Sequence, residues 1–139
     1  GGNAVMQKTG ILNSEIAKVL ADMGHTDQMT IGDCGLPVPS GVKKIDLALR
    51  FGQPSFIDVV SEVAKYMKIE KIYVAPEMEK ENPKQWKAMH EVFPENEVEW
   101  VVLSSHEEFK KLTVNSKAVI RTGETTPFSN VVLQSACIF

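Results

Sequence analysis

The segment Ser55–Ala75, with the sequence SFIDVVSEVAKYMKIEKIYVA, places one helix directly before one strand and sets the pattern for the rest of the chain. Ser55 followed three residues later by Asp58 is a helix-capping signature. Apolar residues then recur at helical spacing and form one broad face, namely Phe56, Val59, Val60, Val63 and Met67. The β-branched stretch Ile69–Ala75 predicts a short strand. Such a pair is typical of α/β proteins.

Helices and strands alternate on both sides of this segment. Asn13 or Ser14 begins a helix whose apolar residues recur at i, i+3, i+4 and i+7 and which stops at Gly24. Asn82-Pro83 and the capping signature Ser105–Glu108 begin two more helices. The predicted strands cover residues 28–33, 45–49, 69–75, 98–103, 118–120 and 131–133. We therefore expect a single α/β domain with a largely parallel sheet flanked by helices on both faces.

Composition narrows the classes of partner. A net charge of −3 over 139 residues lacks the basic excess that nucleic-acid binding requires. No stretch approaches the roughly 18 consecutive apolar residues of a membrane span, and the start of the chain has no signal-peptide core. Cys34 and Cys137 match neither a disulfide framework nor a zinc-ligand spacing. We expect a cytoplasmic protein that binds neither nucleic acid nor membrane.

The first five residues of the chain precede the first methionine. Residues 1–5, GGNAV, precede Met6 and look like a remnant of an expression vector. The remaining length suits one compact domain of ordinary size. We therefore expect one domain over residues 6–139.

Polar residues come directly after three of the predicted strands. Asp33 ends the first strand, Ser105-His106 follow another, and Arg121–Glu124 follow a third. Because ligands of parallel sheets bind at the carboxyl ends of the strands, these groups are expected to converge on one rim. His106 falls in the first turn of its helix, where it is either a ligand contact or an ordinary surface residue.

His25 is the candidate for proton transfer. It follows Gly24 at the end of a helix, and histidine is the side chain that titrates nearest neutrality. Asp27 and Asp33 are the carboxylates expected to orient its ring. The alternative is a histidine that only stabilises the helix end. A metal site would need a third ligand, and His90 and His106 lie on other elements, so no metal is expected.

The loop Thr122–Asn130 combines an aromatic ring with an amide, the two chemistries that hold a sugar, although an ordinary loop has the same composition. Cys34 lacks the positive surroundings that a thiolate nucleophile needs. The chain contains no phosphate-binding glycine loop, no Gly-x-Ser-x-Gly elbow and no His-Glu-x-x-His motif. These observations favour small-molecule chemistry without a cofactor.

An ordered set of motifs runs through nearly the whole chain. It comprises Gly10–Ser14, Ala17–Asp27, Asp33–Val42, Lys44–Leu47 and Ala118–Pro127. With this order and spacing the chain closely resembles the RbsD/FucU sugar mutarotase family.

The resemblance implies an activity and a site. It implies the cofactor-independent interconversion of the pyranose and furanose forms of D-ribose, in a cytoplasmic protein that serves ribose uptake and catabolism. It makes His25 the general acid, Asp33 and His106 sugar ligands, and the segment of Phe128, Ser129 and Asn130 the remaining sugar contact. It also implies a homodecamer of two pentameric rings, with sites at subunit boundaries.

One departure from the family pattern leaves other functions open. The family usually carries tyrosine where this chain has Phe128, and often alanine where it has Ser129. Loss of the phenol makes a ribose-binding module without catalysis the first alternative. A phosphoryl carrier that uses His25 or Cys34 is the second.

Overall fold

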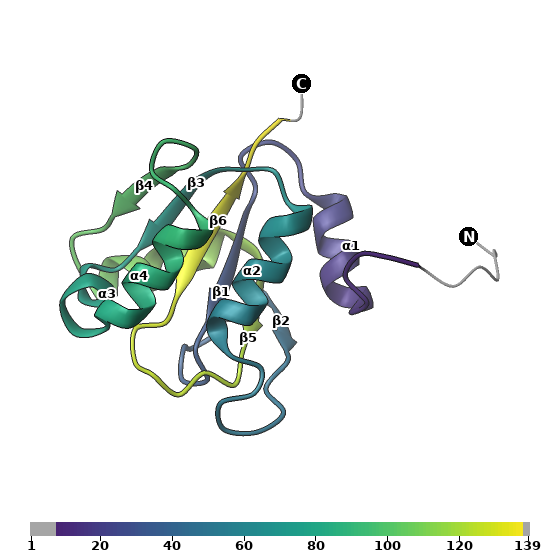
Figure 1. Ribbon diagram of the computed structural model, residues 1–139. Helices are drawn as coiled ribbons and strands as arrows, with labels where there is room; N and C mark the ends of the chain where they lie inside the picture. Colours follow the sequence, from purple (N-terminus) through teal and green to yellow (C-terminus); the bar gives the residue numbers. More distant parts are fainter. Residues whose placement is uncertain (1–7, 138–139) are drawn as a thin grey trace.

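The computed structural model describes residues 8–137, so residues 1–5, expected to be a remnant, and both ends of the predicted domain lie outside the described part. Six strands form one sheet in the order β2-β5-β1-β6-β3-β4 (Figure 1). The strands are β1 (Gln28–Gly32), β2 (Lys43–Asp46), β3 (Ile69–Val74), β4 (Glu99–Val102), β5 (Ser116–Arg121) and β6 (Val131–Ser135).

All the described strands but one run in the same direction. β1 pairs with β5 in parallel, as do β2 with β5 and β3 with β4. β6 lies between β1 and β3 and is antiparallel to both. The prediction of a largely parallel sheet is confirmed.

Helices cover both faces of this sheet. On one face lie α1 (Ser14–Asp22), α2 (Phe56–Tyr66), α3 (Pro76–Glu81) and α4 (Pro83–Val92), and Figure 1 shows α2 and α4 in front of the strands. On the other face α5 (His106–Leu112), followed by the 3-10 turn η1 (Thr113–Asn115), packs Phe109 against Val119 and Val132. Within residues 8–137, no helix has the length and apolarity needed to cross a bilayer.

The sheet has one hydrophobic cluster on each face, as strand geometry requires. Alternate side chains of a strand point to opposite faces, so Val119 joins the cluster under α5 while its neighbour Ile120 joins the larger cluster under α1–α4. Met29 and Ile31 on β1 likewise point to the larger cluster, and both are fully buried. Burial on both faces explains why these strands are nearly continuous apolar runs.

The predicted capping residues begin their helices. The side-chain oxygens of Asn13, Ser55 and Ser105 accept hydrogen bonds from the backbone N–H three residues later, at 2.9, 3.2 and 3.1 Å. These bonds satisfy N–H groups that have no partner inside a helix. α1 ends at Asp22, two residues before the predicted stop at Gly24.

One predicted strand has other bounds in the structure, and one helix was not predicted. The strand predicted over 45–49 is wrong in its bounds, because β2 begins at Lys43 and ends at Asp46. The Asp46 carboxylate accepts a hydrogen bond from Ala48 N at 3.0 Å and turns the chain there. The short helix α3 was not expected, because its six residues are too few to show helical periodicity. Pro76 at its first turn is the sequence signal that marks it.

The carboxyl ends of β1 and β5 are tied together by hydrogen bonds. Thr122 donates to the carbonyl of Gly32 with both its backbone N–H, at 3.0 Å, and its hydroxyl, at 2.8 Å. Cys34 N donates to Glu124 O at 2.9 Å. The segments that leave the two strands are therefore held at a fixed spacing.

Gly123 lies where two loops meet, and replacing it should destabilise the fold. A Cβ at Gly123 would lie 2.3 Å from Gln53 O and 2.6 Å from Arg50 O, both rigid backbone atoms. We expect Gly123→Ala to lower the free energy of unfolding by about 1–3 kcal/mol in urea denaturation. Gly24→Ala is the matched control, because its Cβ would have no neighbour closer than 3.7 Å. Equal stability of the two variants would contradict the argument.

Glu124 joins the loop after β5 to the start of α2. Its Oε1 accepts from Phe56 N at 3.0 Å, and its Oε2 accepts from the Thr126 hydroxyl at 2.8 Å. Partial burial raises the pKa of Glu124, but these hydrogen bonds outweigh burial and hold the pKa below its ordinary value of 4.5.

Glu124→Gln should therefore destabilise the protein by about 1–2 kcal/mol at neutral pH. Because the pKa is lower in the folded state than in the unfolded state, the stabilisation is complete above 4.5 and is lost as pH falls through the folded-state pKa. Urea unfolding from pH 7 to pH 3 should show wild type and variant converging at the acid end. A difference that stays constant with pH would count against this assignment.

Candidate active site

A cavity of about 320 Å³ opens at the carboxyl end of β1. Its lining comes from the segment after β1, from α5 and from the loop between β5 and β6. The polar side chains that line it are Asp33, His106, Lys110, Glu124, Thr125 and Asn130, and Phe128 adds an aromatic ring. Asp33, His106 and Glu124 thus lie on one rim, as the strand-end argument predicts. Arg121 does not line this cavity and donates to Asp46 instead.

Asp33 is held in place from its backbone outward. Its N–H donates to Asn130 Oδ1 at 3.0 Å, and its own Oδ1 accepts from Gly35 N at 3.1 Å. Burial raises the pKa of Asp33 above its ordinary value, against the opposing effect of hydrogen bonds from Gly35, Ser129 and Asn130. A carboxyl group in this setting accepts hydrogen bonds from a ligand when ionised and exchanges a proton more readily than an exposed one.

His106 presents an unsatisfied polar atom. Its ring lies edge-on to Phe128, with centroids 5.2 Å apart and planes at 87°, and parallel to Phe109 at 6.1 Å. Its Nδ1 is buried and has no hydrogen-bond partner among residues 8–137. Such a group is costly to bury alone, so it indicates a place where a polar ligand binds.

Phe128 and Ser129, the residues before Asn130, contribute to the site in different ways. Phe128 has a φ of 63°, a left-handed conformation that is strained for a bulky side chain and that sets its ring against His106. The Ser129 hydroxyl is fully buried, where it donates to Thr126 O at 2.9 Å and accepts from Asn82 Nδ2 at 3.1 Å. Ser129 therefore reaches the site through its backbone bond to Asp33 rather than through its side chain.

Lys110 lines the cavity but was not predicted from the sequence, whereas Glu124 belongs to a segment that the strand-end argument places there. Lys110 lies four residues after His106 on α5, so helical spacing alone places the two side chains on one face. Its ammonium is 3.4 Å from Glu107 Oε1 and leaves other donors free for a ligand.

His25 lies at the other end of β1. It precedes the strand and Asp33 follows it, so five strand residues at about 3.3 Å each separate the two within one chain. His25 is not among the residues that line the cavity. The chain therefore brings Asp33, His106, Phe128 and Asn130 together, but it does not bring His25 to them.

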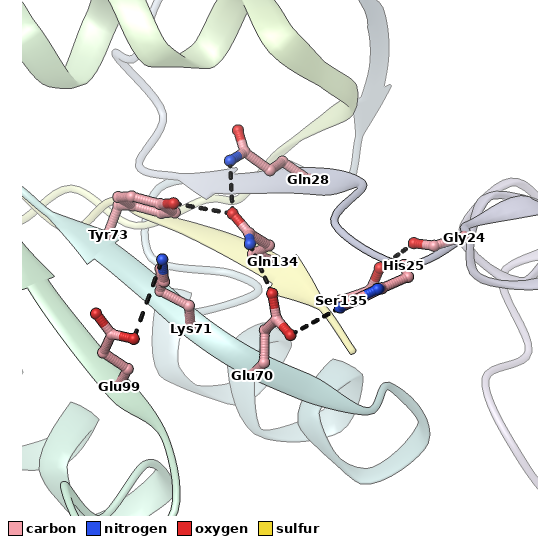
Figure 2. Close-up of polar contacts among 9 residues, drawn as sticks. All are labelled: Gly24, His25, Gln28, Glu70, Lys71, Tyr73, Glu99, Gln134 and Ser135. Atoms are coloured by element: carbon pink, nitrogen blue, oxygen red, sulfur yellow. Dashed lines mark hydrogen bonds and ion pairs between the residues drawn. The ribbon is translucent and has the colours of Figure 1, made fainter. Parts of the chain in front are cut away.

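The expected carboxylate partners of His25 are wrong. Asp27 accepts from Gly24 N at 2.8 Å instead, and Asp33 is at the far end of the strand. The His25 ring pairs with Glu70 on β3, with Nε2 and Oε1 3.0 Å apart (Figure 2). Sequence reasoning missed Glu70 because only the sheet order, with β6 alone between β1 and β3, brings it within reach of the chain that enters β1.

The third histidine takes no part in this site. His90 stacks on Trp100 at a centroid distance of 3.8 Å, and its Nδ1 lies 2.9 Å from Trp86 O. Within the described range, no group of three or more His, Cys, Asp or Glu residues is arranged to hold a metal ion.

A family model and similar sequences both match nearly the whole chain. The family model described as the RbsD / FucU transport protein family matches residues 6–138. A Staphylococcus haemolyticus protein named D-ribose pyranase is 55% identical over 134 residues, which cover 96% of this chain and all of the relative.

Solved structures agree with the sequence matches. The structure of Bacillus subtilis RbsD complexed with D-ribose is 51% identical, with a TM-score of 0.89 over 96% of this chain and all of that one. The fucose mutarotase of Streptococcus pneumoniae, in complex with L-fucose, has a TM-score of 0.75 at 18% identity over 92% of this chain and 95% of that one, which shows a shared fold. Given the match over residues 6–138 and a relative that aligns over its whole length, this chain belongs to the RbsD / FucU transport protein family.

Proposed function

We propose that this chain is a D-ribose pyranase, an isomerase that interconverts the pyranose and furanose forms of D-ribose without a cofactor. The observation that carries the proposal is the cavity, where the carboxyl of Asp33, the unpartnered Nδ1 of His106 and the amide of Asn130 face a small space beside an aromatic ring. Donors, acceptors and an aromatic surface at close range suit a small polyol. Relatives named D-ribose pyranase, which align over their whole length at 50–55% identity, support ribose as the substrate.

The chemistry requires two proton transfers. Opening the ring breaks the bond between the anomeric carbon and the ring oxygen, which takes up a proton, while the anomeric hydroxyl gives up its proton and becomes the aldehyde oxygen. Closure through a different hydroxyl reverses both transfers and changes the ring size. His25 acts as the acid at the ring oxygen, and Asp33 or a bound water takes the hydroxyl proton, each contributing about 10²–10⁴-fold. Asp33, His106, Phe128 and Asn130 hold the sugar.

His25 has to come from a second copy of the chain. One β-strand separates it from the cavity in its own subunit, and its side chain is half exposed, so another molecule can reach it. A site completed across a subunit boundary agrees with the ring-shaped homodecamer that the family resemblance implies. A cytoplasmic location and a role in ribose uptake and catabolism belong to the same proposal.

A ribose-binding module without catalysis is the second candidate. Phe128 favours it, because this side chain keeps the aromatic face that a sugar stacks on and lacks the phenol that the family usually has there. Saturable ribose binding without faster exchange between the ring forms would support this module over an isomerase. A phosphoryl carrier would instead gain the mass of one phosphoryl group on incubation with a phosphodonor system.

Removing the His25 imidazole should abolish most of the acceleration. We expect His25→Ala to slow the exchange between ribose forms by about 10²–10⁴-fold, measured by NMR saturation transfer. Ribose binding should persist, because the cavity does not contain His25. His90→Ala is the matched control and should exchange at the wild-type rate. Exchange by His25→Ala at the wild-type rate would reject the catalytic role.

Two inactive variants should restore each other if the site spans two subunits. Subunits with His25→Ala and subunits with Asp33→Asn each lack one half of every site when assembled alone. When they are co-expressed, some boundaries combine an intact His25 with an intact Asp33. We expect the mixed assembly to recover a measurable fraction of the exchange rate, up to about a quarter for random mixing of one such boundary per site. No recovery in a confirmed mixed assembly would contradict a shared site.

A further inference from the structure

A chain of hydrogen bonds leads from His25 into the sheet (Figure 2). His25 Nε2 meets Glu70 Oε1 at 3.0 Å, and Glu70 Oε2 accepts from Gln134 Nε2 at 2.7 Å. The amide oxygen of Gln134 accepts from Tyr73 OH at 2.8 Å and from Gln28 Nε2 at 2.9 Å. The ring at the surface is thus connected to groups on β1, β3 and β6.

Each hydrogen bond in this series has a fixed donor and a fixed acceptor. The hydrogen bonds from Gln134 and His25 hold the pKa of Glu70 below its ordinary value, so Glu70 is an ionised carboxylate near neutral pH. An ionised carboxylate only accepts hydrogen bonds. Gln134 therefore has to turn its NH₂ group to Glu70 and its oxygen to the donors Tyr73 and Gln28.

The same reasoning fixes the tautomer of His25. Facing an acceptor, Nε2 has to carry a proton, and in the neutral ring the lone pair then lies on Nδ1. Nδ1 has no hydrogen-bond partner in residues 8–137, and 51% of the side chain is exposed. The nitrogen that is free to exchange a proton is the one directed away from Glu70.

The contact differs from an ordinary surface pair of the same composition. His90 and Glu95 are 3.4 Å apart, and the Glu95 side chain is 69% exposed with no second partner to hold it among residues 8–137. Glu70 is 31% exposed, and its other oxygen is fixed by Gln134, which is 8% exposed. Because Gln134 fixes the Glu70 carboxylate, Glu70 in turn restrains the His25 ring.

We propose that Glu70, held by Gln134, is a positioning residue that fixes the His25 ring as its Nε2–H tautomer and leaves Nδ1 to exchange the proton with the sugar of a neighbouring subunit. This inference rests on the proposed function, and it adds an orienting carboxylate to the acid. In the protonated ring, Nδ1–H passes its proton to the ring oxygen of the sugar as the bond to the anomeric carbon breaks. Nε2 keeps its proton throughout, and Glu70 remains ionised.

The tautomer can be measured without any assay of activity. Protein labelled with ¹⁵N in histidine, sedimented in its native assembly, gives imidazole nitrogen signals by magic-angle-spinning NMR at alkaline pH, where imidazoles are neutral. The signals of His25 are assigned by their loss in His25→Asn. We expect the wild type to show only the Nε2–H form of His25. Glu70→Gln has the same shape, but its amide can donate a hydrogen bond as well as accept one, so this variant should show both forms. Both forms in the wild type, or the Nδ1–H form alone, would overturn the proposal.

Exchange rates measure whether positioning matters to catalysis. We expect Glu70→Gln to lower the maximal exchange rate about 10- to 100-fold with little change in the ribose concentration at half-saturation, because Glu70 does not touch the sugar. In a His25→Ala background, Glu70→Gln should change the rate by less than about 2-fold, since the two residues act as one unit. Glu95→Ala, at the other His–Glu pair, should leave the rate unchanged.

The outcomes separate the two hypotheses. Wild-type exchange in Glu70→Gln, beside an inactive His25→Ala, would overturn the role of Glu70 while His25 stays the acid. Additive losses in the double variant would also overturn it, because they indicate a structural effect alone. A wild-type protein that binds ribose and does not accelerate exchange would overturn the proposed function, and the catalytic part of this inference with it.

Discussion

The reversed direction of β6 is the constraint on which both ends of this molecule depend. β6 lies between β1 and β3 and is antiparallel to both, so its first residue meets the carboxyl end of β1 and its last residues meet the start of β1. Asn130, just before β6, therefore reaches Asp33 N at the cavity. Gln134 and Ser135, at the end of β6, reach Glu70 and the carbonyl of Gly24 beside His25. A parallel strand in this position would exchange the two ends.

Close backbone packing at the cavity end converts this topology into a defined site. A Cβ at Gly32 would lie 2.5 Å from Leu36 Cδ2 and 2.9 Å from Asn130 Oδ1, so only glycine lets Asn130 approach the end of β1. Asn130 is 3% exposed and holds the backbone of Asp33. The strained φ of Phe128 lies two residues earlier, where the chain has to turn its ring toward His106 before entering β6. Rigid surroundings of this kind keep ligand groups in place before a ligand arrives.

Much of this arrangement was predictable from local sequence, because it depends on periodicity and on the residues that come directly after each strand. The caps at Asn13, Ser55 and Ser105 and the convergence of Asp33 and His106 on one rim are of this kind. The pairing of His25 with Glu70 was not predictable, because the two are 45 residues apart and no local pattern reports which strands become neighbours. For the same reason the buried, fully bonded hydroxyl of Ser129 could not be told from a free one.

The separation of His25 from Asp33 has a consequence for how activity and assembly are related. In the proposed function, the acid His25 and the sugar in the cavity cannot belong to one subunit, because the strand β1 holds His25 and Asp33 at opposite ends. In the proposed ring, each subunit brings His25 to the cavity of one neighbour and receives His25 of another neighbour at its own cavity. The acid must then be rigid in its own subunit, because its position relative to the sugar is already subject to the fit of the interface. In this proposal Glu70, whose carboxylate is fixed by Gln134, holds the His25 ring in place and leaves Nδ1 for the sugar.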